Sequence, residues 1–253
     1  MKLENAEVIV VERPYKTVYK DNDRIVKVFS EEHGKANVFN EALCHARVEE
    51  SGFDVPEVLE VSKIDDKWAI AIKYVPGRTL ETLMLEEPNK IETYMEQFVD
   101  LQLEMHKVTV PRLGLQKEKL ARKINAEKDA IDATTRYELN TRLDAMPKHT
   151  KLCHGDFVPS NVIVREDGSM TIVDWSHATK GNASGDAALT YLQFALKDQG
   201  LAEMYLSMFC KKSDTARQYV QKWMPIVAAA RLSKGIEEEK EFLMKWIDII
   251  DFQ

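Results

Sequence analysis

Residues 152–175 constrain the fold of this chain more than any other stretch of the sequence. Within this stretch the dipeptide Asp167-Gly168 separates two short apolar runs, residues 162–164 and 170–173. An Asp-Gly pair is typical of a two-residue hairpin loop, because both of its residues tolerate positive φ angles. The pattern therefore predicts a pair of antiparallel strands at this point in the chain.

The predicted hairpin also positions polar side chains. With a two-residue loop, Asn161 lies directly opposite Asp174, and directly opposed Cβ atoms are about 4.5–5.5 Å apart. Two oxygen-bearing side chains at that separation suit Mg²⁺, which usually takes one or two protein oxygens and keeps several waters. Asp156 precedes the hairpin, and a carboxylate beside the metal pair can accept a proton. The alternative is an ordinary hairpin with polar residues at its open end.

The order of these polar residues resembles that of a known enzyme family. His154-Gly155-Asp156 is followed, five residues after the Asp, by Asn161, and then by Asp174 at the head of Asp-Trp-Ser. This order is similar to the catalytic loop and the metal-binding Asp of the kinase-like phosphotransferases. The His-Gly-Asp form resembles the aminoglycoside phosphotransferase and choline kinase branch, whose members phosphorylate hydroxyl groups of small molecules. The resemblance implies that Asp156 is the catalytic base and that Asn161 and Asp174 hold Mg²⁺.

The resemblance also implies a fold class. We expect an α+β, bilobal protein-kinase-like fold, with a small β-rich N-terminal lobe that carries one helix and a large, mainly helical C-terminal lobe. The implied domains are residues 1–75, the nucleotide-binding lobe, and residues 76–253, the catalytic and acceptor-binding lobe. Pro76-Gly77 follows an apolar run and forms a turn, which marks the hinge between the lobes.

The N-terminal part of the sequence is predicted to form strands and one helix. Alternating apolar residues predict the strands, and the spacing of Phe39, Ala42, Leu43 and Ala46 predicts a helix that buries these residues. The strands are expected at residues 7–11, 17–19, 24–29, 57–62 and 68–74, and the helix at residues 35–50.

Lys27 lies on one face of the third predicted strand, among apolar neighbours. In the fold that the chain resembles, a lysine of the third strand contacts the α and β phosphates of the nucleotide, and a helical Glu pairs with it. The resemblance implies these roles for Lys27 and Glu41. It also implies main-chain contacts of the adenine ring with Lys73, Tyr74 and Val75. The alternatives are an edge lysine whose stem covers apolar residues and a solvated Glu in an acidic segment.

The C-terminal part of the sequence is predicted to be helical. Apolar stripes predict helices at residues 91–106, 187–196, 201–211, 213–232 and 236–250, with a thinly apolar helical pair at residues 116–146. Asp186 is expected to be the N-cap of its helix, and Pro225 is expected to end or kink another. The run from Asp174 resembles the family pattern D-x-x-x-A-x-x-G-x-x-x-x-D-x-A, which implies that Asp186, together with His154, supports the catalytic loop.

Composition excludes some classes of function. The 253 residues are 44% hydrophobic, which suffices for a sizeable core in one domain or two lobes. The formal net charge of −7 argues against a nucleic-acid partner and slightly favours a cationic second substrate. Cys44, Cys153 and Cys210 form no Cys-x-x-Cys pair, which indicates reduced thiols and no zinc site. No apolar run is long enough to span a bilayer and no export signal is recognisable, so we expect a cytoplasmic protein without a membrane partner.

The sequence therefore predicts an ATP-dependent phosphotransferase that moves the γ-phosphoryl group of Mg-ATP to a hydroxyl group of a small molecule, as aminoglycoside phosphotransferases do. A choline, amino-alcohol or sugar kinase is one alternative. A catalytically weak or silent nucleotide-binding protein is another, because the expected phosphate-covering segment, residues 12–16, has no glycine and Asp-Trp-Ser replaces Asp-Phe-Gly. A protein kinase is disfavoured, since Gly155 replaces Arg and no Ala-Pro-Glu element is present. An unrelated helical binding protein is the last alternative, and no oligomeric state is predicted.

Overall fold

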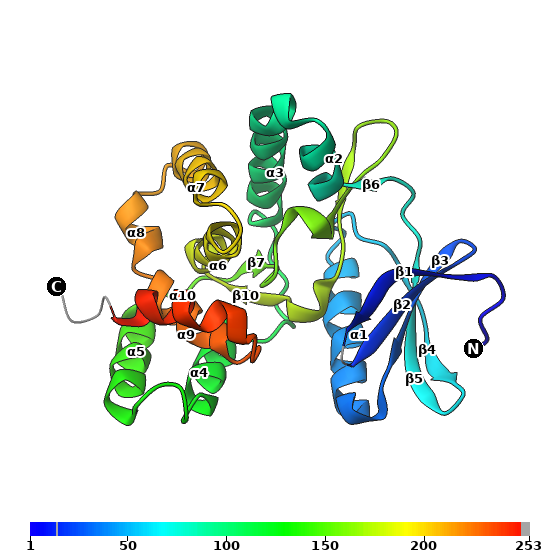
Figure 1. Cartoon of the computed structure of the whole chain (residues 1–253), viewed down its shortest axis with the longest axis horizontal. Helices are drawn as coiled ribbons and strands as arrows, with labels where there is room; N and C mark the ends of the chain where they lie inside the picture. Colours follow the sequence, from blue (N-terminus) through cyan, green and yellow to red (C-terminus); the bar gives the residue numbers. More distant parts are fainter. Residues whose placement is uncertain (14, 249–253) are drawn as a thin grey trace. The chain divides into compact units, whose positions relative to one another are not determined.

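The structure of the chain is a computed structural model that describes residues 1–13 and 15–248. Its contacts divide the chain into two compact units (Figure 1). The first unit comprises Met1–Leu83 and Ser160–Ala178, and the second comprises Met84–Pro159 and Thr179–Gln253. The first unit thus includes the segment that carries Asn161 and Asp174. The expected assignment of separate roles to two lobes stays a prediction.

A five-stranded antiparallel sheet is the framework of the first unit. Its strands lie in the order β1-β2-β3-β5-β4 and are β1 (Ala6–Arg13), β2 (Lys16–Asp21), β3 (Arg24–Phe29), β4 (Val58–Ile64) and β5 (Lys67–Lys73). Helix α1 (Lys35–Glu49) packs against β4 and β5. The core between helix and sheet consists of Phe29, Val38, Ala42, Ile70 and Ile72. The predicted strands and helix are confirmed, with ends that differ by a few residues.

The buried face of α1 differs from the predicted one. Phe39 and Leu43 are 44% and 46% exposed. The buried residues of the helix are Val38, Glu41, Ala42, His45 and Val48. The spacing of apolar residues did not predict the buried face, because this face includes polar groups with partners elsewhere in the unit. For example, His45 Nε2 donates to the carbonyl oxygen of Pro56 at 2.6 Å. Phe39 instead covers Trp68 edge-on, with ring centroids 5.0 Å apart.

The predicted hairpin is present, but its register is shifted by one residue. Strand β8 (Val162–Val164) pairs with β9 (Met170–Ile172) in antiparallel fashion. The N–H of Val173 donates to the carbonyl oxygen of Asn161 at 2.9 Å, so these two residues lie opposite each other. The prediction that Asn161 lies directly opposite Asp174 is therefore wrong.

The shift arises because the hairpin loop has three residues instead of two. Of the loop residues, all of which the structure describes, only Gly168 has a positive φ angle, 82°. Its N–H donates to the carbonyl oxygen of Arg165 at 3.0 Å, and the carboxylate of Asp167 accepts from the N–H of Ser169 at 2.9 Å. A type I turn followed by a left-handed Gly is a common three-residue loop, and the added residue moves every strand pair by one.

A third short strand, β6 (Arg78–Thr79), pairs with β8 to complete the small sheet of the first unit. Gly77 precedes it with a φ angle of 148°, and a Cβ atom at this position would lie 2.3 Å from the carbonyl oxygen of Val164. Only Gly permits this approach, which explains why the predicted Pro-Gly turn stands here.

Helices form most of the second unit, around a two-stranded sheet of β7 (Lys151–Cys153) and β10 (Thr179–Gly181) (Figure 1). Helix α2 (Leu80–Glu86) precedes these helices in the chain. The helices are α3 (Ile91–Met105), α4 (Gln116–Ala126), α5 (Ala133–Ala145), α6 (Ala183–Ala195), α7 (Gln199–Ser213), α8 (Arg217–Gln221), α9 (Met224–Leu232) and α10 (Glu237–Asp248). Helix α9 is buried along its whole length and forms the centre of the unit.

One helix boundary in the second unit matches its prediction and one differs. The helix predicted at residues 213–232 is interrupted just before Pro225: α8 ends at Gln221, and Pro225 stands in the first turn of α9, where a proline needs no N–H acceptor. The N-cap of α6 is Asn182, whose side chain accepts from the N–H of Ser184 at 2.9 Å. Asp186 lies in the first turn of this helix, so the prediction that it is the N-cap is wrong.

Within residues 1–13 and 15–248, no helix combines the length and the apolar character that crossing a membrane requires. The three cysteines, Cys44, Cys153 and Cys210, are free thiols, and Cys153 is buried.

Candidate active site

In the first unit, Lys27 lies between two carboxylates. Its Nζ is 2.7 Å from Oε1 of Glu41 and 2.7 Å from Oδ1 of Asp174. Strand β3 supplies the lysine, α1 supplies the Glu, and the Asp follows β9. Lys27 is only 6% exposed. The structure thus brings together three residues that the sequence singled out, while their roles stay predictions.

Burial and charge act in opposite directions on these groups. Burial alone would lower the pKa of Lys27, but the carboxylates of Asp174 and Glu41 outweigh it and raise that pKa. Burial alone would raise the pKa of Asp174, but the ammonium groups of Lys27 and Lys16 hold it well below its ordinary value. Lys27 and Asp174 are therefore both charged at neutral pH.

A second lysine, Lys16, belongs to the same group of charges and was not predicted from the sequence. It is buried, and its Nζ lies 3.7 Å from Oε1 of Glu41 and 3.8 Å from Oδ2 of Asp174. The signal in the sequence is weak: Lys16 and Val18 alternate with half-buried neighbours, so both side chains lie on one face of β2. Lys16 also ends the segment that was expected to cover the phosphates.

Asp174 has an unusual backbone conformation. Its φ and ψ angles are 63° and 59°, in the left-handed region, which costs about 1–2 kcal/mol for residues other than glycine. Such residues are concentrated at functional sites. The turn is anchored by Trp175, which is fully buried and whose Nε1 donates to the carbonyl oxygen of Ile172 at 3.0 Å.

The two residues predicted to bind Mg²⁺ both lie at the open end of the β8–β9 hairpin. Asn161 ends the short helix η3 (Pro159–Asn161) directly before β8, and Asp174 follows β9. Both are half-buried. One carboxylate and one amide oxygen are a donor set that Mg²⁺ accepts, so the residues fit the metal although they are not directly opposed.

In the second unit, Asp156 follows β7 and has polar partners from two other segments. Its Oδ1 accepts from Nε2 of Gln193, on α6, at 2.6 Å and lies 3.3 Å from Nζ of Lys234. The N–H of Asp156 donates to Nδ1 of the fully buried His154 at 3.2 Å. Gln193 and Lys234 stand 37 and 78 residues further along the chain, and no local sequence pattern pointed to them.

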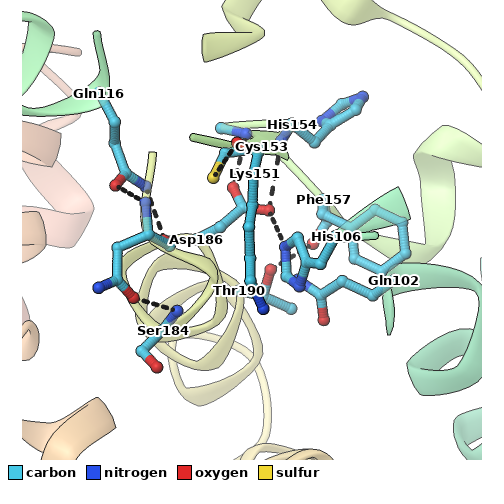
Figure 2. A network of polar contacts seen from close by, with 12 residues as sticks. Gln102, His106, Gln116, Lys151, Cys153, His154, Phe157, Ser184, Asp186 and Thr190 are labelled. Carbon is cyan, nitrogen blue, oxygen red and sulfur yellow. Dashed lines mark hydrogen bonds and ion pairs between the residues drawn. The ribbon is translucent and has the colours of Figure 1, made fainter. Parts of the chain in front are cut away.

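Figure 2 shows how Asp186 holds the loop that carries the predicted base. Its carboxylate, which is 2% exposed, accepts from the N–H of Gly155 at 2.8 Å and from the N–H of His154 at 3.2 Å. His106, at the end of α3, brings its Nε2 to the same carboxylate at 3.1 Å. Burial alone would raise the pKa of Asp186, but the bonds from His106 and Gly155 hold it below its ordinary value. This geometry supports the role expected from the resemblance.

Cys153 lies beside this network, and among the described residues it has His106 and Asp186 as its possible partners in a metal site. One ligand atom from each residue lies within 4.8 Å of the others. Burial raises the pKa of the Cys153 thiol well above its ordinary value, and a thiol must lose its proton to bind a metal. Both oxygens of Asp186 already accept from N–H groups. The cluster is therefore structural.

The predicted hinge offers limited main-chain groups to a nucleotide base. The N–H of Lys73 donates to the carbonyl oxygen of Glu57 at 2.8 Å, and the N–H of Tyr74 donates to the carbonyl oxygen of Asp23 at 2.8 Å. These two N–H groups are therefore already used within the protein. In the part of the chain that the structure describes, the N–H of Val75 has no acceptor. A pocket of about 420 Å³ adjoins the hinge and is lined by Asp54, Val55, Pro56, Glu57, Lys73, Tyr74, Val75, Pro76 and Arg165.

The sequence of residues 12–221 matches the model of a protein family described as the phosphotransferase enzyme family, abbreviated APH. The chain belongs to this family.

Several solved structures are similar to that of this phosphotransferase. The apo form of a thermostable mutant of aminoglycoside phosphotransferase APH(4)-Ia has a TM-score of 0.74 at 13% identity, over 98% of this chain and 94% of that chain. Choline kinase LicA from Streptococcus pneumoniae has a TM-score of 0.67 at 16% identity, over 98% of this chain and 94% of that chain. Aminoglycoside-3'-phosphotransferase of type VIII has a TM-score of 0.60 at 17% identity, over 87% of this chain and 94% of that chain. No curated protein sequence matches the chain.

These comparisons confirm three predictions about this phosphotransferase. The family is the one that the motif resembled, and the fold is protein-kinase-like, with a β-rich N-terminal part and a helical C-terminal part. The enzyme class, a phosphotransferase that acts on hydroxyl-bearing small molecules, follows from the family. Because the solved structures are less than 25% identical, they establish the fold alone.

Proposed function

We propose that this phosphotransferase transfers the γ-phosphoryl group of Mg-ATP to a hydroxyl group of a small molecule. The observation that carries the proposal is the contact of Lys27 with Glu41 and Asp174, at 2.7 Å in each case. Burying such charges is costly, and apolar side chains of similar volume often pack at least as well. A binding function accounts for these charges better than stability does.

The nucleotide is proposed to bind in the first unit. Lys16 and Lys27 supply two buried positive charges for its phosphates, and the N–H of Val75 is a donor for its base. The similar enzyme APH(4)-Ia has been solved in ternary complexes of hygromycin B with AMP-PNP or ADP, and LicA has been solved with AMP. These complexes support ATP as the phosphoryl donor of this chain.

Asn161 and Asp174 are proposed to hold Mg²⁺. When bound, the ion would neutralise negative charge on the phosphates. Asp174 meets the requirement that a metal-binding carboxylate be ionised, because its pKa is held well below its ordinary value. In the protein without bound metal, Lys27 balances the negative charge of Asp174.

Asp156 is proposed to orient the acceptor hydroxyl and to take its proton. Phosphoryl transfer leaves little covalent work to the protein, so catalysis depends on positioning and on neutralising charge. The bonds from His154 and Gly155 to Asp186 hold the loop of Asp156 at its main chain, and they serve this positioning.

The acceptor is proposed to be a small hydroxyl-bearing molecule. The candidates by resemblance are aminoglycosides, choline and other amino alcohols, and sugars. The net charge of −7 favours a cationic acceptor, whereas the side chains nearest Asp156 include a lysine. A cytoplasmic location is part of the proposal, because ATP is the donor. The absence of a nucleic-acid partner is also part of it, because the net charge is −7. A catalytically silent nucleotide-binding protein is the second candidate, favoured by the lack of glycine in residues 12–16.

The experiment combines calorimetric titration with ATP, with and without Mg²⁺, and measurement of slow ATP hydrolysis without acceptor. We expect Asp174→Asn to lose the Mg²⁺-dependent part of ATP binding and to lower hydrolysis at least about 100-fold, because it removes a charge from the metal-binding pair. The matched control is Asp66→Asn, which changes an exposed Asp of the same unit that also has a positive φ angle, 65°.

Undiminished Mg²⁺-dependent hydrolysis in Asp174→Asn contradicts the proposal. A wild-type protein that binds Mg-ATP but neither hydrolyses it nor phosphorylates any acceptor supports the silent alternative instead.

A further inference from the structure

Two lysines of the second unit, Lys234 and Lys123, interact with the carboxylate of Asp156. Nζ of Lys234 is 3.3 Å from Oδ1 of Asp156. Lys123, on α4, is subject to the charges of Lys234, Asp156 and Arg231. Figure 1 shows α4 beside α9 and α10, and α4 packs against α9, which carries Arg231 near its end. The predicted base therefore lies in a basic environment.

The position of Lys234 is set by the turn that closes α9. Its N–H donates to the carbonyl oxygen of Arg231 at 2.9 Å, and the N–H of Gly235 donates to that of Leu232 at 2.9 Å. Gly235 has a φ angle of 64°, the left-handed conformation that commonly ends a helix. The ammonium group of Lys234 is thus presented by a defined turn.

Lys123 has no direct partner among the described residues. It is half-buried, and no described residue forms an ion pair or hydrogen bond with its side chain. Burial lowers the pKa of Lys123, the charge of Lys234 lowers this pKa further, and the charge of Asp156 opposes both effects. A further anion near Lys123 would favour its charged ammonium.

Arg231 is compensated within the protein. It is 9% exposed, and its Nε and Nη2 each donate to Glu239 at 2.6 Å. Its Nη1 is buried and has no hydrogen-bond partner among the described residues. Arg231 and Glu239 therefore neutralise each other. Among the other charges of this group, two lysines, Lys123 and Lys234, interact with the single carboxylate of Asp156, so the group has one more positive than negative charge.

We propose that the acceptor carries an anionic group, a carboxylate or a phosphate, that binds Lys123 and Lys234 while its hydroxyl group is bound at Asp156. The inference rests on the proposed phosphotransfer function and narrows the substrate class of that site. Lys234 already makes the direct contact with Asp156, so Lys123 is available to such an anion. A cationic acceptor would instead be repelled by both lysines.

Gln193 also contacts the carboxylate of Asp156. Its amide nitrogen donates to Asp156, and a carboxylate can accept only from that end of the amide.

The test uses small hydroxyl compounds that differ in one charged group. Glycerol, glycerate and glycerol 3-phosphate form one set, and 3-aminopropanol and homoserine form a second. Their kcat/KM values with Mg-ATP are measured, and their Kd values are measured calorimetrically in the presence of AMP-PNP. We expect an anionic member to bind and react at least about tenfold better than its partner without the anion, because hydrogen bonds to charged groups are the strong ones. Glycerate and glycerol 3-phosphate distinguish a carboxylate from a phosphate.

Variants link this preference to the two lysines. Lys123→Met and Lys234→Met should each raise the Kd and KM of the preferred acid about tenfold. Lys123→Arg keeps the positive charge, so it should retain most of the wild-type affinity for the acid. The Kd of the uncharged partner should change much less than that of the acid. Lys222→Met, an exposed lysine of the same unit, is the matched control and should behave as wild type.

The inference is overturned if uncharged or cationic compounds bind at least as well as every anionic one, or if the preference for the acid survives both lysine substitutions. Failure of the proposed function is recognised separately, because a wild-type protein that does not bind Mg-ATP fails before any acceptor is added.

Discussion

The ammonium group of Lys27 is shared by the carboxylates of Glu41 and Asp174, and Lys16 contributes a second cation to the same group. These charges are buried and balanced, so removing one member leaves another without compensation. The resemblance to the family singled out Lys27, Glu41 and Asp174, and the structure brings these three residues together. Lys16 was missed because a buried lysine in an alternating strand cannot be distinguished by pattern from an exposed one.

Lys27→Met should lower kcat/KM for ATP at least about 100-fold, since it removes a charge-bearing donor from the proposed phosphate site. Steady-state kinetics and calorimetric titration with ATP measure the effect. Lys67→Met makes the same substitution at an exposed position of β5 and should leave both quantities unchanged. A Lys27→Met enzyme with wild-type kcat/KM would remove this lysine from the nucleotide site.

His45 predicts a pH dependence of stability. Its ring is 2% exposed, and burial lowers its pKa to about 4, against about 6.5 in an unfolded chain. Because the unfolded state binds the proton more readily, the contribution of His45 to the free energy of unfolding is complete above pH 6.5. This contribution is lost as the pH falls to about 4, and it amounts to about 3 kcal/mol at most.

His45→Gln keeps an amide donor for the carbonyl oxygen of Pro56 but does not titrate. Urea unfolding at pH 7.5 and pH 4.5 should therefore show a smaller loss of stability in the variant than in the wild type. Equal losses in both proteins would mean that His45 does not remain neutral in the folded state.

At the scale of elements, the apolar runs predicted the β8–β9 hairpin, but its register depended on one backbone choice. Asp tolerates both the right-handed and the left-handed helical regions, so Asp167-Gly168 is compatible with a loop of two residues or of three. The side chain of Asp167 accepts from the N–H of Ser169, an interaction of the three-residue loop that dipeptide statistics do not distinguish. The local sequence does not contain the information that decides between the two loops.

Polar residues with distant partners caused the other errors at this scale. The face of α1 that carries Glu41 and His45 is buried because their partners lie on β3 and directly before β4. Asp186 was taken for an N-cap, since a carboxylate in a first helical turn is typical of one. Its carboxylate instead accepts from main-chain N–H groups 31 and 32 residues away.

The pairing of β6 with β8 predicts that Gly77→Ala is strongly destabilising. The variant combines a strained φ angle of 148° with a Cβ atom 2.3 Å from the carbonyl oxygen of Val164, and it should lower the free energy of unfolding by about 2 kcal/mol or more. Gly114→Ala is the control, because nothing lies within 4 Å of its Cβ position. Chemical denaturation measures both. A Gly77→Ala protein as stable as Gly114→Ala would contradict the close approach of this turn to β8.

At the scale of the whole molecule, a few polar residues at fixed spacing predicted the family and the protein-kinase-like fold, and the family match and similar structures confirm both. The surroundings of Asp156 could not be predicted in the same way, because Gln193 and Lys234 come from segments far along the chain. Net charge was a poor guide for a related reason. A total of −7 suggested a cationic acceptor, whereas the charges next to Asp156 are basic.

The most direct test of the account compares phosphoryl transfer with nucleotide binding in Asp156→Asn. The substitution removes the proton acceptor but keeps a side chain of the same shape, so the single-turnover rate of transfer to the preferred acceptor should fall at least about 100-fold. The Kd of Mg-ATP should stay close to the wild-type value, and Asp129→Asn, an exposed control in the same unit, should change neither quantity. An Asp156→Asn enzyme that transfers phosphate at the wild-type rate would contradict the assignment of Asp156 as the base, and with it the proposed mechanism.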